Sequence, residues 1–211
     1  SVDILSSGLK KLNCSNNKLT YMNLGILYGL NLEEVNCSNN KITNIVMDSV
    51  GELVKFDCSN NDLMTLDVSQ CLKLEELNCS GNQLMELDVG HQTQLTQLDC
   101  SNNKLTELNV KQNGSLTSLI CNDNQLTTLD LSHNHSLSKL NCAKNRLACL
   151  DVTGISGGTI TANGNRRPIA VRTDGKFDLT TLSGFNVGKA TNWNGGSVSG
   201  TILTVEDGKD E

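Results

Sequence analysis

Hydrophobic and polar residues alternate along most of the chain in a pattern that returns every 21 residues, after a first interval of 23. The pattern reads Leu-x-x-Leu-x-Cys-x-x-Asn-x-Leu-x-x-Leu-x-Val and is followed by five linking residues. Repetition at a period of about 20 to 50 residues is typical of proteins built from stacked structural units. Seven copies follow one another in phase, and they begin at Leu9, Leu32, Leu53, Leu74, Leu95, Leu116 and Leu137.

The first half of each copy predicts a short β-strand. Leu-x-Cys places apolar side chains at alternate positions, which is the period of a strand with one buried face. Because every copy is entered in the same direction, the strands should stack into a parallel sheet at about 4.8 Å per strand, a ladder about 30 to 35 Å long. The second half alternates again, and 21 residues leave little room for a helix. We therefore expect a β-rich solenoid with a parallel concave sheet and short strands or extended segments on the convex side.

An asparagine occupies the ninth place of every copy. Asparagine tolerates left-handed backbone geometry, and its amide can satisfy buried backbone groups at a tight turn. We therefore predict a structural ladder of amides, formed by Asn17, Asn40, Asn61, Asn82, Asn103, Asn124 and Asn145.

This frame resembles the leucine-rich-repeat family, with cysteine at the place where the family usually has its third leucine. The clearest copies are LEELNCSGNQLMELDVGHQTQ from Leu74 and LTQLDCSNNKLTELNVKQNGS from Leu95. The 21-residue length and the Leu-Asp-Val second half are similar to bacterial surface and internalin-like versions of the repeat. The resemblance covers about Leu9 to Val152 and implies the same solenoid.

The frame stops after Val152. We therefore divide the chain into a leucine-rich-repeat solenoid, residues 1–152, and a C-terminal β capping module, residues 153–211. The second part resembles a small β module that accompanies such repeats in surface proteins of gut Firmicutes, and it lacks that module's last strands. We expect it to be truncated. Residues 1–12 carry no signal-peptide pattern and no distinct cap, so we also expect the native protein to extend upstream.

Three strand-like runs mark the capping module, at residues 168–172, 176–179 and 197–205. Half of the six aromatic residues of the chain lie in this part. A solenoid needs a cover over its last unit. We expect the aromatic side chains to lie over Leu150 and Val152 of the last repeat, and they are Phe177, Phe185 and Trp193.

Seven in-phase cysteines occupy an inward position that is interchangeable with leucine, where free cysteine acts as a small hydrophobe. Parallel side chains would have to turn toward each other to reach the Cβ separation of about 3.8 Å that a disulfide prefers. We therefore expect reduced thiols and no metal cage. Cys71 lies in a link between repeats, and Cys149 has an outward place where its thiol should be more accessible. The seven are Cys14, Cys37, Cys58, Cys79, Cys100, Cys121 and Cys142.

No constellation of residues indicates catalysis, a cofactor or a metal site. The chain has no phosphate loop, no Ser-His-Asp order and no paired carboxylates in a plausible cleft. Its histidines, His91, His133 and His135, lie in polar links. The net charge of -6 argues against sequence-independent binding to the phosphates of nucleic acids. No apolar run reaches the roughly 18 residues of a membrane span.

An acidic column recurs in the second half of the repeats, and it has two interpretations. Stacked carboxylates recruit Ca²⁺ in some proteins, since oxygen atoms are its ligands. Carboxylates at this position can instead accept hydrogen bonds from the backbone of the turn that follows. The column consists of Asp67, Asp88, Asp130 and Asp151, with Asn109.

Two rows of concave residues differ in how much they vary. The residue before each cysteine is asparagine or aspartate except at Ile120, which fits a stabilising side-chain ladder. The residue before the central leucine varies freely, and a row of different side chains can be recognised specifically by a ligand. The candidate binding surface is therefore this row with Ile120: Lys11, Glu34, Lys55, Glu76, Gln97, Ser118 and Lys139.

Other interpretations of these polar residues remain open. The row can be no more than solvated side chains, because it has no aromatic residue of the kind that dominates protein interfaces. A second candidate surface is the Ser-Asn-Asn edge with its neighbouring cations, namely Asn16, Asn39, Asn60 and Asn102 with Lys18, Lys41, Lys104 and Arg146.

We hypothesise a non-catalytic recognition or adhesion module of a bacterial cell-surface or secreted protein. Its partner would be a protein, of the host or otherwise extracellular, or a glycan, bound on the concave sheet. The alternative is a structural spacer that displays other domains of a larger surface protein. No nucleic acid, membrane insertion or cofactor is expected.

Overall fold

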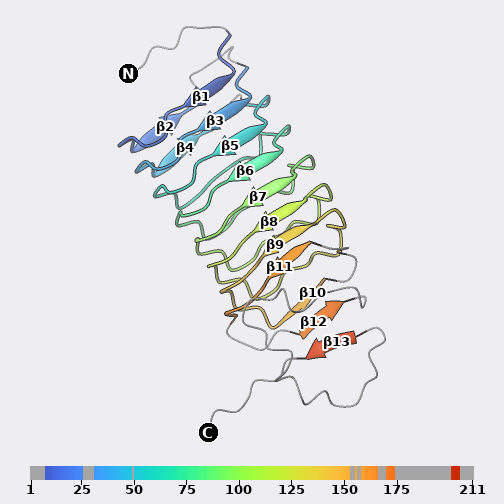
Figure 1. Ribbon diagram of the computed structural model, residues 1–211. Helices are drawn as coiled ribbons and strands as arrows, with labels where there is room; N and C mark the ends of the chain where they lie inside the picture. Colours follow the sequence, from blue (N-terminus) through green and yellow to red (C-terminus); the bar gives the residue numbers. More distant parts are fainter. Residues whose placement is uncertain are drawn as a thin grey trace.

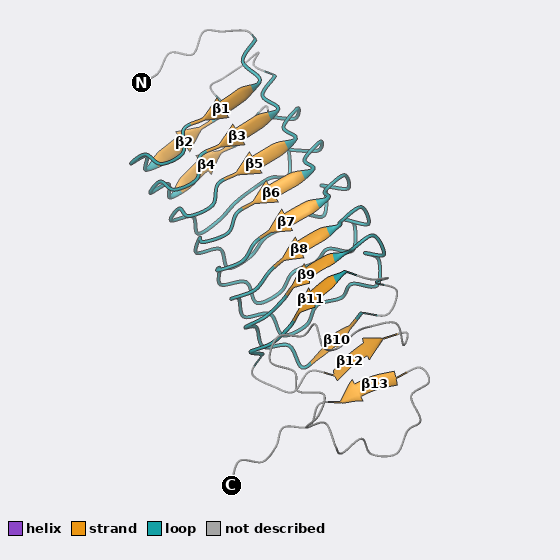
Figure 2. Ribbon diagram, viewed as in Figure 1, coloured by secondary structure: helices purple, strands orange, loops and turns teal. Residues whose placement is uncertain are grey.

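The computed structural model describes residues 8–25, 31–48, 50–152, 155, 158–165, 170–173 and 201–204. Strand follows strand in a continuous stack (Figure 1), and the described residues contain strands, turns and extended segments but no helix (Figure 2). The strands are β1 (Lys11–Asn13), β2 (Tyr21–Asn23), β3 (Glu34–Asn36), β4 (Asn44–Val46), β5 (Lys55–Asp57), β6 (Glu76–Asn78), β7 (Gln97–Asp99), β8 (Ser118–Ile120), β9 (Lys139–Asn141), β10 (Cys149–Asp151), β11 (Thr159–Thr161), β12 (Ala170–Thr173) and β13 (Thr201–Thr204).

The main sheet is parallel and has eight strands, in the order β1-β3-β5-β6-β7-β8-β9-β11 (Figure 1). Each strand pairs with the equivalent residues of the next rung, so that Glu76 aligns with Gln97 and Leu77 with Leu98. We call each repeat a rung and name it by its first leucine. The predicted solenoid with a parallel concave sheet is confirmed.

The rungs from Leu32 to Leu137 bury equivalent apolar side chains, whereas Leu9, Leu12 and Cys14 of the first rung are only partly buried. In the Leu74 rung, Leu74, Cys79, Leu84 and Val89 are fully buried, and Leu77 is nearly so. Burial of apolar surface stabilises by about 25 cal/mol for each Å² removed from water, so the repeated set holds the rungs together. A single three-residue strand has no such partner surface, which is why the rungs are stable only as a stack.

The asparagine ladder lies inside the turn after each strand of the main sheet. The Asn103 amide donates to the carbonyl oxygens of Cys79, Cys100 and Ser101, at 3.0, 3.1 and 3.2 Å. Its oxygen accepts the backbone N–H of Leu84, in the preceding rung, at 2.9 Å. The bonds to Cys79 and Leu84 join this rung to the preceding one, and the bonds to Cys100 and Ser101 close the turn of its own rung. The predicted structural role is confirmed.

The left-handed residue of this turn is the eighth of the frame, and the expectation that placed it at the ninth is wrong. Asn102, for example, has a φ of 52°, and its neighbour Asn103 is not among the residues of positive φ. The ninth asparagine is held by its four hydrogen bonds instead. Positive φ recurs at Asn16, Asn39, Asn60, Gly81, Asn102, Asp123, Lys144 and Gly164.

The opposite side of the solenoid is formed by shorter pieces of sheet and by extended chain. Strands β2 and β4 pair in parallel near one end. At the other end β10 pairs in parallel with β12, and β13 is antiparallel to β12. Between them the Leu53 to Leu116 rungs are extended on this side without strand assignment (Figure 2). The expected mixture of short strands and extended segments is therefore present.

An eighth rung follows the seven that the leucine frame predicts. β11 aligns Thr159, Ile160 and Thr161 with the three residues of β9. Ala162 is buried where other rungs have cysteine, and Asn165 donates its amide to the carbonyls of Ala162 and Cys142. The concave sheet thus continues past Val152, while the division of the chain into two domains at this point stays a prediction.

The predicted capping module, residues 153–211, is described in three strands, of which β11 belongs to the main sheet. β12 and β13 coincide with two of the strand-like runs, at 168–172 and 197–205. The third run and the three aromatic residues that we expect over the last repeat, Phe177, Phe185 and Trp193, lie outside the described residues.

Candidate functional site: the concave groove

The predicted row lies in one shallow groove along the main sheet. The groove has a volume of about 630 Å³, and its floor includes alternate residues of β1, β3 and the following strands. All eight predicted residues line it: Lys11, Glu34, Lys55, Glu76, Gln97, Ser118, Ile120 and Lys139. The parallel register places them side by side because each strand contributes the same two outward positions.

Ion pairs between neighbouring rungs order the first half of this row. Lys11 Nζ lies 2.7 Å from Glu34 Oε1, and Lys55 Nζ lies 2.7 Å from Glu76 Oε1. The hydrogen bond from Lys55 to Glu76 raises the pKa of the Lys55 ammonium, which favours its charged form. Exposed pairs of this kind stabilise a fold little. They do fix four side chains of the groove in place before a partner arrives.

The other half of the row is different in charge. Gln97 and Ser118 are neutral, and Lys139 is exposed and makes no ion pair within the part of the chain that the structure describes. The groove therefore runs from a region of paired charges to a region with one unpaired ammonium group.

The uniform row next to it caps the turns that follow the strands. Asp99 Oδ1 accepts the backbone N–H of Ser101 at 3.0 Å and its hydroxyl at 2.7 Å. Asn78 does the same for Ser80, at 3.1 and 2.7 Å. A short acceptor at this position satisfies a donor that the turn would otherwise leave free. This role explains the uniformity and shows that these residues are structural.

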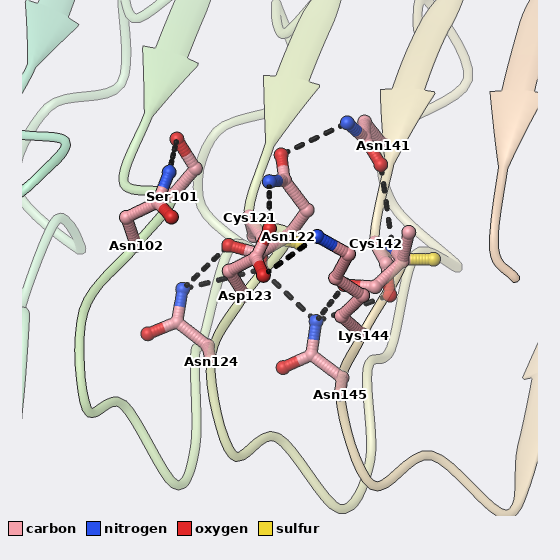
Figure 3. Close-up of polar contacts among 11 residues, drawn as sticks. Ser101, Asn102, Cys121, Asn122, Asp123, Asn124, Asn141, Cys142, Lys144 and Asn145 are labelled. Atoms are coloured by element: carbon pink, nitrogen blue, oxygen red, sulfur yellow. Dashed lines mark hydrogen bonds and ion pairs between the residues drawn. The ribbon is translucent and has the colours of Figure 1, made fainter. Parts of the chain in front are cut away.

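The Leu116 rung, residues 116–136, departs from this scheme (Figure 3). Ile120 takes the capping position and has no acceptor to offer. Asn122 replaces the serine, and its side chain accepts from the Asn141 amide at 2.9 Å and donates to Asp123 at 2.7 Å. Asp123 also lies 3.2 Å from Lys144 Nζ. A different set of polar contacts therefore joins this rung to the next one.

A second groove, of about 780 Å³, lies over the second half of the rungs and contains Asp67, Asp88, Asn109 and Asp130 of the acidic column. Asp67 Oδ1 accepts the backbone N–H of Ser69 at 2.9 Å, and Asp130 that of Ser132 at 3.0 Å. Hydrogen bonds from Ser69 and Ser132 lower the pKa values of the two carboxyl groups. The interpretation that the column bonds to the backbone of the turn is confirmed at these positions. No cluster of three or more potential metal ligands occurs among the described residues.

The cysteines outside Cys149 are free thiols, and all of them except the half-buried Cys14 are buried. Burial raises the pKa of the Cys37 and Cys142 thiols to about 12, so they remain protonated and weakly nucleophilic. Cys71 is also buried, and its pKa is raised to about 12 for the same reason. The Cys149 side chain, expected to be more accessible, is outside the description.

The remaining candidates are exposed and lie apart from the concave row. His91, His133 and His135 are exposed in the links between rungs. The Ser-Asn-Asn edge contains the left-handed turn residues, so a conformational requirement accounts for its asparagines. No helix in the described part of the chain is long and apolar enough to cross a membrane.

Comparison with known proteins agrees with this architecture. The Leucine Rich Repeat family profile matches residues 31–53. The functional domain of InlJ from Listeria monocytogenes, described as including a cysteine ladder, is 38% identical with a TM-score of 0.71, over 83% of this chain and 37% of that one. A leucine-rich-repeat protein of Leptospira interrogans is 22% identical with a TM-score of 0.71, over 80% of this chain and 45% of that one.

The fold and these matches define a leucine-rich-repeat protein, a class whose solenoids generally serve as protein-binding modules and are typically non-catalytic. The chain fits the internalin-like members of that family and has a ladder of buried cysteines in its core. An internalin of Listeria monocytogenes, InlF, shares the fold at 18% identity and a TM-score of 0.56, over 74% of this chain and 54% of that one.

The chain spans little more than a third of the InlJ domain and less than half of the Leptospira protein. No protein among curated sequences matches it at a significant level. The partners of the intact protein are therefore a matter for the proposal that follows.

Proposed function

We propose that this chain is a non-catalytic recognition module of a bacterial cell-surface or secreted protein and that it binds an extracellular protein on its concave sheet. The single observation that carries the proposal is the groove, whose eight side chains stand on the regular parallel strands of the main sheet. A glycan is the second ligand class that such a polar groove accommodates.

The contrast between recurring buried residues and varied groove residues in each rung supports this proposal. The buried leucines, the cysteine and the asparagine recur because stacking requires them, whereas the row before the central leucine changes from rung to rung. Specific binding needs variation of this kind, since a uniform row would offer every partner the same contact in each register. The location at the cell surface is supported by the internalin-like repeats.

Order within the groove also favours binding. The pairs Lys11–Glu34 and Lys55–Glu76 hold their side chains extended along the sheet. Immobilising a long side chain on association costs about 0.5 to 1.5 kcal/mol, and a group that is already held avoids part of that cost. The scaffold therefore presents charge in a fixed pattern of alternating sign.

The test is binding of the immobilised chain to a panel of extracellular proteins and glycans, compared with a row variant. The row variant replaces Lys11, Glu34, Lys55, Glu76 and Lys139 with Ser. We expect its affinity for any partner to fall by about tenfold or more, because the charges at the centre of the contact are lost. Surface plasmon resonance measures the ratio, and circular dichroism confirms that the variant remains folded.

The matched control removes the same charges elsewhere. It replaces three lysines and two glutamates, all exposed and outside the groove, with Ser: Lys18, Lys41, Lys104, Glu86 and Glu107. We expect the control variant to bind like the natural chain. Equal binding by the row variant would place the site on another face, and no binding by the natural chain would favour the spacer.

A further inference from the structure

The Leu116 rung departs from the repeat frame at Ile120, one of its two residues that face the groove. Its strand β8 presents Ser118 and Ile120, and both line the groove and are only partly buried. The strands on either side present longer or more polar residues in register with them, namely Gln97 and Asp99 in β7 and Lys139 and Asn141 in β9.

Ile120 gives up a contact that its counterparts make. Asp99 and Asn141, one rung away on each side, accept the backbone N–H two residues ahead, at 3.0 and 3.2 Å. An isoleucine has no acceptor for the N–H of Asn122. Its apolar side chain is not enclosed in the core either, so the substitution improves neither the turn nor the interior. A residue that departs from the repeat without stabilising the fold is expected at a functional site.

The side chains around Ile120 form a notch. Ser118 has the shortest side chain in the row, and the adjoining rungs carry Gln97 and Lys139. Neighbouring strands are about 4.8 Å apart, so the two longer side chains flank a space one rung wide above Ser118 and Ile120. Ile120 makes one wall of the space apolar, and Lys139 borders it with a cation. Asp99, in register with Ile120, borders the other side with a carboxylate that already accepts from Ser101.

Charge distinguishes this notch from the rest of the groove. Lys11 and Lys55 are each neutralised by a glutamate one rung away. The rungs next to Lys139 present Ser118 and Thr159 at that position, and no carboxylate pairs with it among the described residues. An unpaired ammonium group beside an apolar surface is complementary to an apolar side chain that adjoins a carboxylate.

We infer that the notch at Ser118 and Ile120 is the specificity site of the groove and that it receives an apolar side chain from an extended protein segment, with a neighbouring acidic residue of that segment paired to Lys139. This inference rests on the proposed function and names the chemistry of the partner. It places the centre of recognition in β8 and β9, away from the ion-paired end of the row.

A displayed library of random linear peptides, selected on the immobilised whole chain, tests it. We expect the enriched peptides to share an apolar residue adjacent to aspartate or glutamate. Synthetic copies should bind I120N and K139E at least about tenfold more weakly than the natural chain. The change K41E, a matched charge reversal at an exposed lysine outside the groove, should alter affinity by less than about twofold.

Peptide variants test directly whether the acidic residue of the peptide pairs with Lys139. A peptide whose acidic residue is replaced by lysine should lose affinity for the natural chain and regain it for K139E. The I120N variant restores the residue that the other rungs have at this place, so it is expected to fold, and circular dichroism checks this.

Different outcomes overturn different claims. Peptides that bind I120N and K139E undiminished but lose binding to the row variant would overturn the inference and leave the concave groove as the binding site. Enrichment without acidic residues would overturn the charge pairing. If every enriched peptide binds the row variant as well as the natural chain, the inference and the proposed function both fail.

Discussion

At the scale of the residue, one asparagine in each rung decides whether the rungs stack. Asn103 contacts three carbonyl groups and one N–H through a side chain that is 9% exposed. A buried donor or acceptor that loses its partner costs about 1 to 3 kcal/mol, whereas each bond made contributes less. The ladder therefore stabilises mainly by leaving no backbone group unpaired where the chain turns.

The Asn103→Ala change should lower the free energy of unfolding by about 3 kcal/mol or more, because the N–H of Leu84 and the carbonyl of Cys79 lose a buried partner. Urea unfolding followed by circular dichroism measures the loss. Asn102→Gly is the control, since Asn102 is exposed and already has a positive φ of 52° that glycine adopts freely. Equal effects of the two changes would contradict the ladder's role.

The sequence predicted the structural role of the ninth asparagine correctly, but it placed the left-handed backbone at the wrong residue. Two consecutive asparagines occur at this turn in several rungs, and composition alone does not say which of them adopts the left-handed backbone. Gly81 and Gly164 at the eighth place carry that information, because glycine is favoured where φ is positive. The ninth place has asparagine in every copy, which indicates a side chain that is needed for its hydrogen bonds.

At the scale of the element, six strands of the concave sheet, β1, β3, β5, β6, β7 and β9, end in a capped turn. Asn36, Asp57, Asn78 and Asp99 accept both the N–H and the hydroxyl of a serine two residues ahead. The cap ends the strand after three residues and directs the chain into the solenoid's edge. Among the described strands of the main sheet, only β8 ends in a residue whose side chain has no acceptor.

The Ile120→Asn change should raise the free energy of unfolding by about 0.5 to 1 kcal/mol, because the new side chain accepts the N–H of Asn122. The structure offers a precedent in the next rung, where Asn141 caps Ala143 without a serine hydroxyl. Urea unfolding measures the gain. Asn78→Ile, which makes the reverse change in another rung, should destabilise. A loss of stability in the first variant would show that Ile120 serves the fold.

The extent of the sheet was only partly predictable. The seven frames that the leucines define correspond to seven strands of the concave sheet, and the second halves are extended as expected. β11 was missed because Ala162 stands for cysteine and the surrounding residues are glycine and threonine. The signal that was available is Asn165, which lies three residues after Ala162 as Asn145 does after Cys142.

At the scale of the whole molecule, the solenoid separates stability from recognition. The inner side chains and the turn caps repeat with each rung, and the row of the groove is free to vary over them. The resemblance of the frame to leucine-rich repeats was sufficient to predict the architecture. The groove residues could be predicted together because side chains along a strand point alternately to the two faces of the sheet, which identifies the outward positions.

What the sequence did not disclose is how those residues interact. The pairing of Lys11 with Glu34 and of Lys55 with Glu76 depends on register between rungs, which only the assembled sheet specifies. The same register leaves Lys139 unpaired beside Ile120. The sequence likewise predicted the acidic residues of the second groove, but it did not predict that they line a groove.

The most direct test of concave recognition is site-specific photo-crosslinking to the partner that the binding panel yields. A benzophenone amino acid is introduced at Gln97, in the middle of the row, or at Glu86, which lines the second groove. Both positions are exposed, so either variant should fold. We predict a covalent adduct with the partner, detected by mass spectrometry, from position 97 and none from position 86. An adduct from position 86 alone would contradict recognition by the concave sheet.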